Sequence, residues 1–151
     1  MSAREPWRLE AIHVFDCVEW HSPAGFAADI VSPGYALIRN DARLLHFAPR
    51  YLLAINQQGA TPPMTATSGA IAIDVTGKWC GYRLHGSHAH DVLAAGTHAD
   101  LVLAGRACAA LSLFDCPIVL LRAATADEIW VPASYAESLC RALNKMENYC
   151  D

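Results

Sequence analysis

The chain has 151 residues, a length that fits one domain or two small halves sharing a core. Apolar residues make up 54% of it and charged residues only 17%, whereas about 25% of an ordinary soluble domain is charged, so we expect a persistent interface with a partner protein. The net charge is −4 and the basic residues are scattered, which argues against nucleic acid as that partner.

The beginning of the chain shows no targeting signal. The first twenty residues carry charges throughout and contain no apolar core, so we expect a cytoplasmic protein rather than a secreted one. No apolar run approaches the roughly 20 residues that a membrane helix needs, and we expect no membrane association. Without an export signal or a Cys-x-x-Cys pair, the cysteines are expected to be free thiols; they are Cys17, Cys80, Cys108, Cys116, Cys140 and Cys150.

The first half of the chain, residues 1–56, reads as a strand, a helix and three further strands. Alternating apolar residues predict a strand over Trp7–Val14. The pair Ser22-Pro23 predicts a helix start, because Ser caps helices and Pro suits the first helical position, and this helix would run to about Val31. Three short strands in a meander are expected next, at Tyr35–Ile38, Arg43–Phe47 and Tyr51–Ile55.

A linker is expected at residues 57–69, a stretch that is poor in periodicity and rich in Gly, Pro and Thr. The second half, residues 70–151, then opens with two predicted strands, Ala70–Val75 and Trp79–Leu84. Apolar side chains alternate in both, which is typical of strands buried on one face. The boundary between the halves is therefore placed at the linker, within one integrated domain.

A capped helix is predicted directly after these two strands. Ser87 suits the N-cap position, and Gly96 suits a left-handed cap at the other end. Between them, Ala89, Val92 and Leu93 recur at i, i+3 and i+4 and form a single apolar stripe.

Three strands and a last helix complete the chain. The strands are expected at Ala107–Phe114, Ile118–Leu121 and Glu128–Val131, and the continuous apolar run of the second is typical of a strand covered on both faces. Ser134 and Glu137 have the spacing of a capping box, and Glu137 and Arg141 that of an i,i+4 ion pair. The helix would place one apolar face toward the core, formed by Ala136, Leu139, Cys140, Leu143 and Met146.

The order of elements is similar in the two halves, and one motif in the second half is typical of a known family. Its spacing is L-x-G-x-x-A-x-x-L-L followed by D-L, in Leu84, Gly86, Ala89, Val92, Leu93, Asp100 and Leu101, and Asp74-Val75-Thr76 stands ahead of it. The motif resembles the folate-binding, aminomethyltransferase-like fold, and within it the gamma subunit family of heteromeric sarcosine oxidases. Residues 45–53 and 131–139 are also similar to that subunit, although Ala133 stands where the family tends to have Arg.

The resemblance implies an α+β fold of duplicated β-α-β units, with antiparallel sheets flanked by helices. It also implies a non-catalytic small subunit that assembles and stabilises an enzyme oxidatively demethylating N-methyl amines. This chain would bind no cofactor itself, and larger partner subunits would carry the flavin and the tetrahydrofolate. The alternative is a stand-alone folate or small-molecule binding protein, or an aminomethyltransferase-like enzyme.

Titratable residues of the types that bind metals gather around the predicted central helix. A metal site needs ligands that converge within about 2.0–2.2 Å of one ion, and His88 and His90 point to different sides of a helix. The remaining candidates are His85, His88, His98 and Asp100. A solvated helix start with interface histidines explains the same residues, so the sequence predicts no metal site.

No catalytic residue is predicted. A G-x-S-x-G elbow, a Walker loop and a G-x-G-x-x-G fingerprint are all absent from the sequence. In aminomethyltransferases of the fold that this chain resembles, a Gly-rich loop ending in Asp places a carboxylate at the folate. The corresponding segment here, Ser112–Pro117, reads as a hairpin turn without glycines, which leaves Asp115 as the one candidate folate contact and favours a turn-capping role for it.

Overall fold

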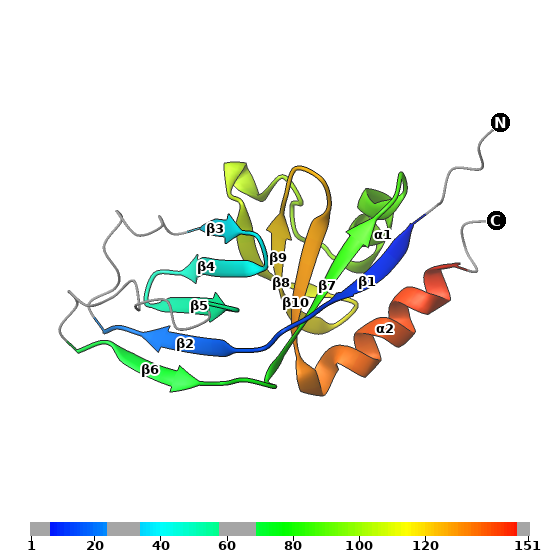
Figure 1. Cartoon of the computed structure of the whole chain (residues 1–151). Helices are drawn as coiled ribbons and strands as arrows, with labels where there is room; N and C mark the ends of the chain where they lie inside the picture. Colours follow the sequence, from blue (N-terminus) through cyan, green and yellow to red (C-terminus); the bar gives the residue numbers. More distant parts are fainter. Residues whose placement is uncertain (1–6, 24–33, 58–68, 148–151) are drawn as a thin grey trace.

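A computed structural model describes residues 7–23, 34–57 and 69–147, which form two five-stranded sheets and two α-helices (Figure 1). Sheet A has the order β1-β7-β10-β9-β8, with β1 (Arg8–Ile12), β7 (Trp79–His85), β10 (Asp127–Pro132), β9 (Cys116–Arg122) and β8 (Cys108–Leu113). Sheet B has the order β3-β4-β5-β2-β6, with β3 (Tyr35–Arg39), β4 (Ala42–Ala48), β5 (Tyr51–Ile55), β2 (Cys17–His21) and β6 (Ile71–Asp74).

The two sheets share one topology and exchange their outermost strands. In sheet A the strands β7, β10, β9 and β8 lie side by side, and in sheet B the strands β2, β5, β4 and β3 repeat that arrangement. The fifth strand of each sheet comes from the other half of the chain, because β1 pairs with β7 and β6 pairs with β2. All these pairs are antiparallel, so the predicted α+β class with antiparallel sheets is confirmed.

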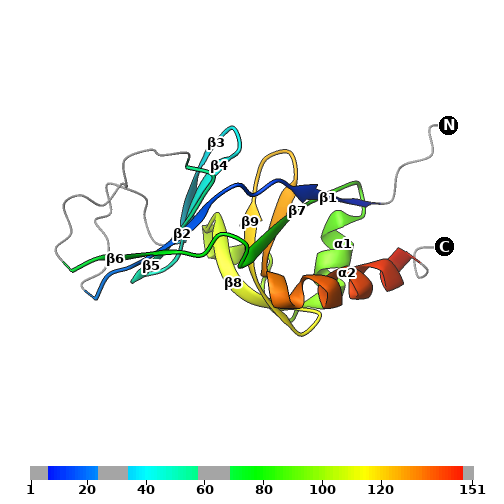
Figure 2. The ribbon, with the colours of Figure 1, turned by 60° about the horizontal axis from the view of Figure 1, so that its bottom comes forward.

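Sheet A is the middle layer of the molecule. The helices α1 (Ala89–Gly96) and α2 (Ala133–Glu147) pack on one of its faces, where Leu93 and Leu139 are fully buried against Ile118 (Figure 2). Sheet B packs on the opposite face through a second cluster, formed by Cys17, Leu45, Leu53, Ile55, Cys108, Val119, Leu121 and Trp130. Among the described residues, no helix has the length and apolar composition that crossing a bilayer requires.

Most of the predicted strands are present. The four residues Ile118–Leu121 are buried on both faces, as their apolar run predicts. The strand β2 was not predicted, and it occupies the residues just before the expected helix at Ser22-Pro23. That helix falls mostly on residues 24–33, and most of the linker on residues 58–68; both stretches lie outside the described residues.

The strand predicted at Ala70–Val75 is present as β6, but the expectation that it is half-buried is wrong. All four residues of β6 are exposed, with 60% of Ile71 and 45% of Ile73 accessible to solvent. The reason is position: β6 is the outermost strand of sheet B, next to β2, and the apolar contacts of the sheet are made by the strands inside it.

The predicted helix caps are also wrong. His88 is the N-cap of α1 and makes no side-chain cap hydrogen bond, and α2 begins at Ala133, so Ser134 lies inside its first turn. Gly96 is the last residue of α1 and is not left-handed; extended Thr97 follows it. A Cβ at Gly96 would collide with the Leu113 and Phe114 side chains, so close packing explains this glycine. The i,i+4 pair of α2 is confirmed, with 2.7 Å between Arg141 Nη2 and Glu137 Oε1.

Candidate functional site

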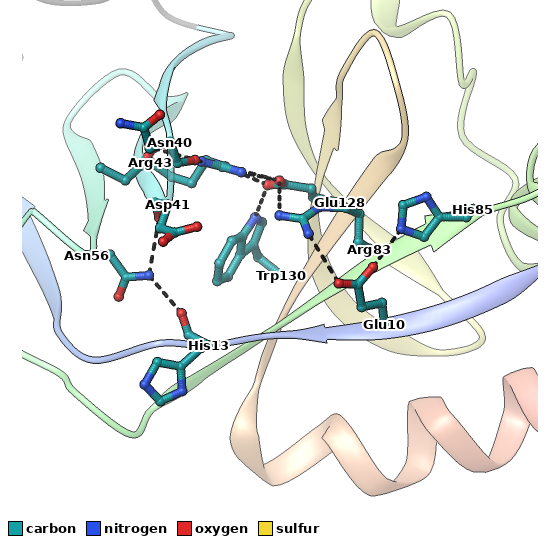
Figure 3. Close-up of polar contacts among 11 residues, drawn as sticks. Glu10, His13, Asn40, Asp41, Arg43, Asn56, Arg83, His85, Glu128 and Trp130 are labelled. Atoms are coloured by element: carbon teal, nitrogen blue, oxygen red, sulfur yellow. Dashed lines mark hydrogen bonds and ion pairs between the residues drawn. The ribbon is translucent and has the colours of Figure 1, made fainter.

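Two charged residues occupy buried positions on strands of different sheets and meet between the sheets. Arg43 lies on β4 of sheet B and Glu128 on β10 of sheet A, and they are 4% and 2% exposed. Arg43 Nη2 lies 2.6 Å from Glu128 Oε1 and Arg43 Nε lies 2.9 Å from Oε2, so both carboxylate oxygens accept from the guanidinium (Figure 3). A buried pair of this geometry fixes how the two sheets meet.

The pair continues outward as a row of alternating charges on sheet A. Arg83 of β7 lies between two carboxylates: its Nη2 is 3.7 Å from Glu128 Oε1, and its Nη1 is 3.7 Å from Glu10 Oε1 (Figure 3). Glu10 of β1 also contacts His85, with 2.9 Å between Glu10 Oε2 and His85 Nε2. Side-chain exposure rises from 3% at Glu128 to 27% at Arg83 and 51% at Glu10, and it is 25% at His85. We call Glu10, Arg43, Arg83, His85 and Glu128 the inter-sheet charge row.

Backbone groups and an indole complete the surroundings of the row. Trp130 Nε1 donates to Glu128 at 3.2 Å, and Arg43 Nη1 donates to the carbonyls of Asn40 and Ala42. The amide of Asn56 joins the chain between β1 and β2 to sheet B, since its Nδ2 donates to the carbonyls of His13 and Asp41 (Figure 3).

A second buried carboxylate, Glu19 of β2, ties sheet B to the start of β7. Lys78 Nζ lies 2.7 Å from Glu19 Oε1, and Trp79 Nε1 donates to the same oxygen at 3.1 Å. Burial by itself raises the pKa of Glu19, but hydrogen bonds with Lys78, Tyr51, Trp79 and His21 outweigh it, and the pKa falls to about 2. Burial and the neighbouring Glu19 raise the pKa of Tyr51.

Both clusters have a structural role, since their ion pairs and hydrogen bonds hold the two sheets together. Arg43, Glu128 and Glu19 contact charged or hydrogen-bonding groups of this same chain, and each pair connects segments far apart in the sequence. Sequence reasoning missed all three residues. The detectable signal is a charged residue within an apolar strand, such as Arg43 in ARLLHFA and Glu128 in DEIWVP.

The candidate metal ligands lie at the two ends of α1. His85 contacts Glu10, and His88 is exposed directly before the helix. His98 and Asp100 follow the helix, and Asp100 Oδ1 accepts from the backbone amide of Val102. Within the described part of the chain, no three or more His, Cys, Asp or Glu side chains are placed to share an ion.

Asp115 is exposed at the tip of the β8–β9 hairpin. Phe114 and Asp115 form its two-residue turn, with φ of 48° and 63°, values that suit a type I′ turn. Asp115 and His98 both line an open depression of about 590 Å³ beside the end of α1. The other lining residues are mostly small and apolar, so the depression offers few groups that would orient a ligand such as folate.

Large apolar side chains are exposed at both edges of sheet B. On β3 they are Tyr35, Leu37 and Ile38, at 44–47%, and on β6 they are Ile71 and Ile73. Clusters of exposed apolar residues on edge strands are typical of surfaces that contact another protein.

The chain is similar in structure to a protein of known activity. No protein-family model matches the sequence, and no curated protein sequence matches it. Among solved structures, a chain of the heterotetrameric sarcosine oxidase from Corynebacterium sp. U-96, in complex with pyrrole 2-carboxylate, is 18% identical in sequence. The similarity covers 93% of this chain and 84% of that chain with a TM-score of 0.71, and the two proteins therefore share a fold.

Proposed function

We propose that the chain is a small subunit of a heteromeric sarcosine oxidase-like enzyme, in which it stabilises the assembly and takes no part in the chemistry. The observation that carries this proposal is the extent of the structural likeness, 93% of this chain and 84% of a chain from a heterotetrameric enzyme. The two chains are therefore of similar length, as expected of corresponding small subunits.

Two features of the molecule support a role in assembly. The exposed apolar side chains on β3 and β6 give it a surface that is more stable when covered by a partner. The buried charges, in contrast, are paired within the chain and hold its two sheets together. The chain would therefore contribute a contact surface to the complex.

The cofactors and the reaction would belong to the partners. Larger subunits would bind the flavin and the tetrahydrofolate, and the complex would oxidatively demethylate an N-methyl amine. No step of that reaction is assigned to a residue of this chain.

A stand-alone binding protein is the competing function, and the depression beside Asp115 and His98 is the feature that favours it. Titration of the purified chain with tetrahydrofolate, followed by calorimetry, separates the two functions. Binding that Asp115→Asn and His98→Ala both weaken would favour the stand-alone protein.

The proposal is tested by purifying the tagged chain from its source organism under native conditions. We expect flavin-containing subunits in fixed stoichiometry with the chain. Removal of its gene should lower the thermal midpoint or the yield of the remaining flavoprotein, because a partner that binds only the folded state stabilises it by mass action, by about 2.7 kcal/mol at a hundredfold excess over Kd. A chain that purifies alone and colourless, with the flavoprotein unchanged by its loss, would contradict the proposal.

A further inference from the structure

The outer edge of β6 presents backbone groups that another strand can bind. Val75 N, directly after β6, donates to Cys17 O at 2.9 Å, while Cys17 N donates to Thr76 Oγ1, so the backbone of Val75 and that of Cys17 face each other between the two strands. Hydrogen-bonded and non-hydrogen-bonded pairs alternate along an antiparallel ladder. The register pairs Ile73 with Glu19 and Ala72 with Trp20, so Ile71 and Ile73 direct their backbone groups toward β2, whereas Ala72 and Asp74 direct theirs outward.

The opposite side of β2 supports this assignment. Asn56 N donates to Asp16 O, and Ser22 N donates to Arg50 O, so the even-numbered residues of β2 bond to the β5 side. The odd-numbered residues are then left for β6, as the Val75–Cys17 bond requires. Among the described residues no strand lies beyond β6, which forms one edge of sheet B (Figure 1).

We infer that the outer edge of β6 receives an extended segment of a partner subunit, which adds a sixth strand to sheet B. The inference rests on the proposed function, since it names the surface through which the subunit would join its complex. The backbone N–H and C=O groups of Ala72 and Asp74 select a strand as the occupant. Ile71 and Ile73 lie on one face of the sheet and favour aliphatic side chains two residues apart in that segment.

The charge of the edge favours a different subunit over a second copy of this chain. The exposed carboxylate of Asp74, at the end of the edge, favours a basic side chain at the matching position of the bound segment. β6 itself has the sequence IAID and carries no basic residue, so a second copy paired through the same edge would not supply one. A stable interface buries roughly 800 Å² on each partner, more than a four-residue strand supplies, so the subunit that donates the segment also makes contact elsewhere.

A pair of matched variants tests the inference. Ile73→Lys places a charge on the β6 edge, and Tyr135→Lys places the same charge on α2, which packs on the face of sheet A opposite to sheet B; the two side chains are 45% and 42% exposed. In native purifications of the full-length chain, we expect Ile73→Lys to reduce the flavoprotein recovered per chain by about tenfold or more, and Tyr135→Lys to leave it unchanged. An unchanged recovery with Ile73→Lys, or an equal loss with both variants, would overturn the inference.

Hydrogen exchange in the wild-type protein tests the strand pairing directly. In the free chain, the amides of Ala72 and Asp74 should exchange quickly and those of Ile71 and Ile73 slowly. In the complex, Ala72 and Asp74 should become protected as well. Protection that does not change on assembly would show that no strand binds there.

Failure of the inference is distinguishable from failure of the proposed function. If flavoprotein co-purifies equally with the wild-type chain and with the Ile73→Lys variant, the subunit role stands and the β6 edge is not its docking site. If the wild-type chain brings down none, the proposed function itself fails. A dimer of the purified chain that Ile73→Lys abolishes would instead identify a second copy as the occupant and overturn the inference.

Discussion

At the residue scale, removing one charge of the buried Arg43–Glu128 pair should destabilise the chain more than removing one charge of an exposed pair. Arg43→Met leaves the Glu128 carboxylate buried, with the Trp130 indole N–H at 3.2 Å and Arg83 at 3.7 Å. Removal of one partner of a buried ion pair costs about 3–5 kcal/mol, which should appear in the free energy of unfolding measured with urea.

The matched control is Arg141→Met, which removes the exposed Glu137–Arg141 pair of α2. The side chains of this pair are 85% and 67% exposed, so the change should stay within about 0.5 kcal/mol. The double variant Arg43→Met, Glu128→Met should lose less stability than the sum of the two single changes. Strict additivity would show that the pair contributes no coupling between the sheets.

Glu19 should make stability depend on pH. Its pKa is about 2 in the folded chain, below the ordinary value of 4.5, so the unfolded chain takes up the proton first as the pH falls. The stabilisation is therefore complete above about pH 4.5 and is lost between pH 4.5 and 2. Glu19→Gln should lower the urea midpoint at pH 7, and its difference from the wild type should shrink toward pH 3.

Glu137→Gln is the control for this pH profile, because Glu137 is exposed and its pair lies on the helix surface. Its urea midpoint should follow that of the wild type at every pH. If Glu19→Gln also ran parallel to the wild type from pH 7 to 3, the hydrogen bonds around Glu19 would not hold its pKa down.

At the element scale, Gly96 gives a prediction opposite to helix propensity. Replacement of a helical Gly by Ala ordinarily stabilises a helix by about 1 kcal/mol. Here the added methyl group would collide with the Phe114 and Leu113 side chains, so Gly96→Ala should destabilise the chain by about 1–3 kcal/mol. A higher thermal midpoint for Gly96→Ala would show that the end of α1 does not pack on the hairpin.

Strands with a regular apolar pattern could be predicted from the sequence, and those that depend on distant contacts could not. The run Ile118–Leu121 identifies β9 because each of its residues is buried. The strand β2 was missed because one of its buried positions carries Glu19, whose main partner, Lys78, lies 59 residues away. The Ile residues of β6 alternate like those of a buried strand, and only the sheet order shows that β6 is an edge.

At the scale of the whole molecule, the sequence indicates the duplication but not the exchange of strands between the sheets. The element order of each half follows from local patterns, whereas the pairing of β1 with β7 depends on distant contacts such as that of Glu10 with His85, which are 75 residues apart. The same limit applies to the inter-sheet charge row. Arg43 and Glu128 are 85 residues apart, so each is visible as an anomaly within its strand while its partner is not.

The last prediction concerns whether this chain supplies a catalytic residue to the assembled enzyme. Asp115 is exposed in a hairpin turn, and its place there suits a turn residue better than a catalytic one. Asp115→Asn should therefore leave the turnover of the assembled complex within about twofold, whereas loss of a general base lowers turnover by about 10²–10⁴. Turnover is measured on complexes whose subunit ratio and thermal midpoint equal those of the wild type, so that assembly and chemistry are separated. Loss of turnover in an intact Asp115→Asn complex would place this chain in the active site, because a subunit that contributes only contact surface has no reacting group to lose.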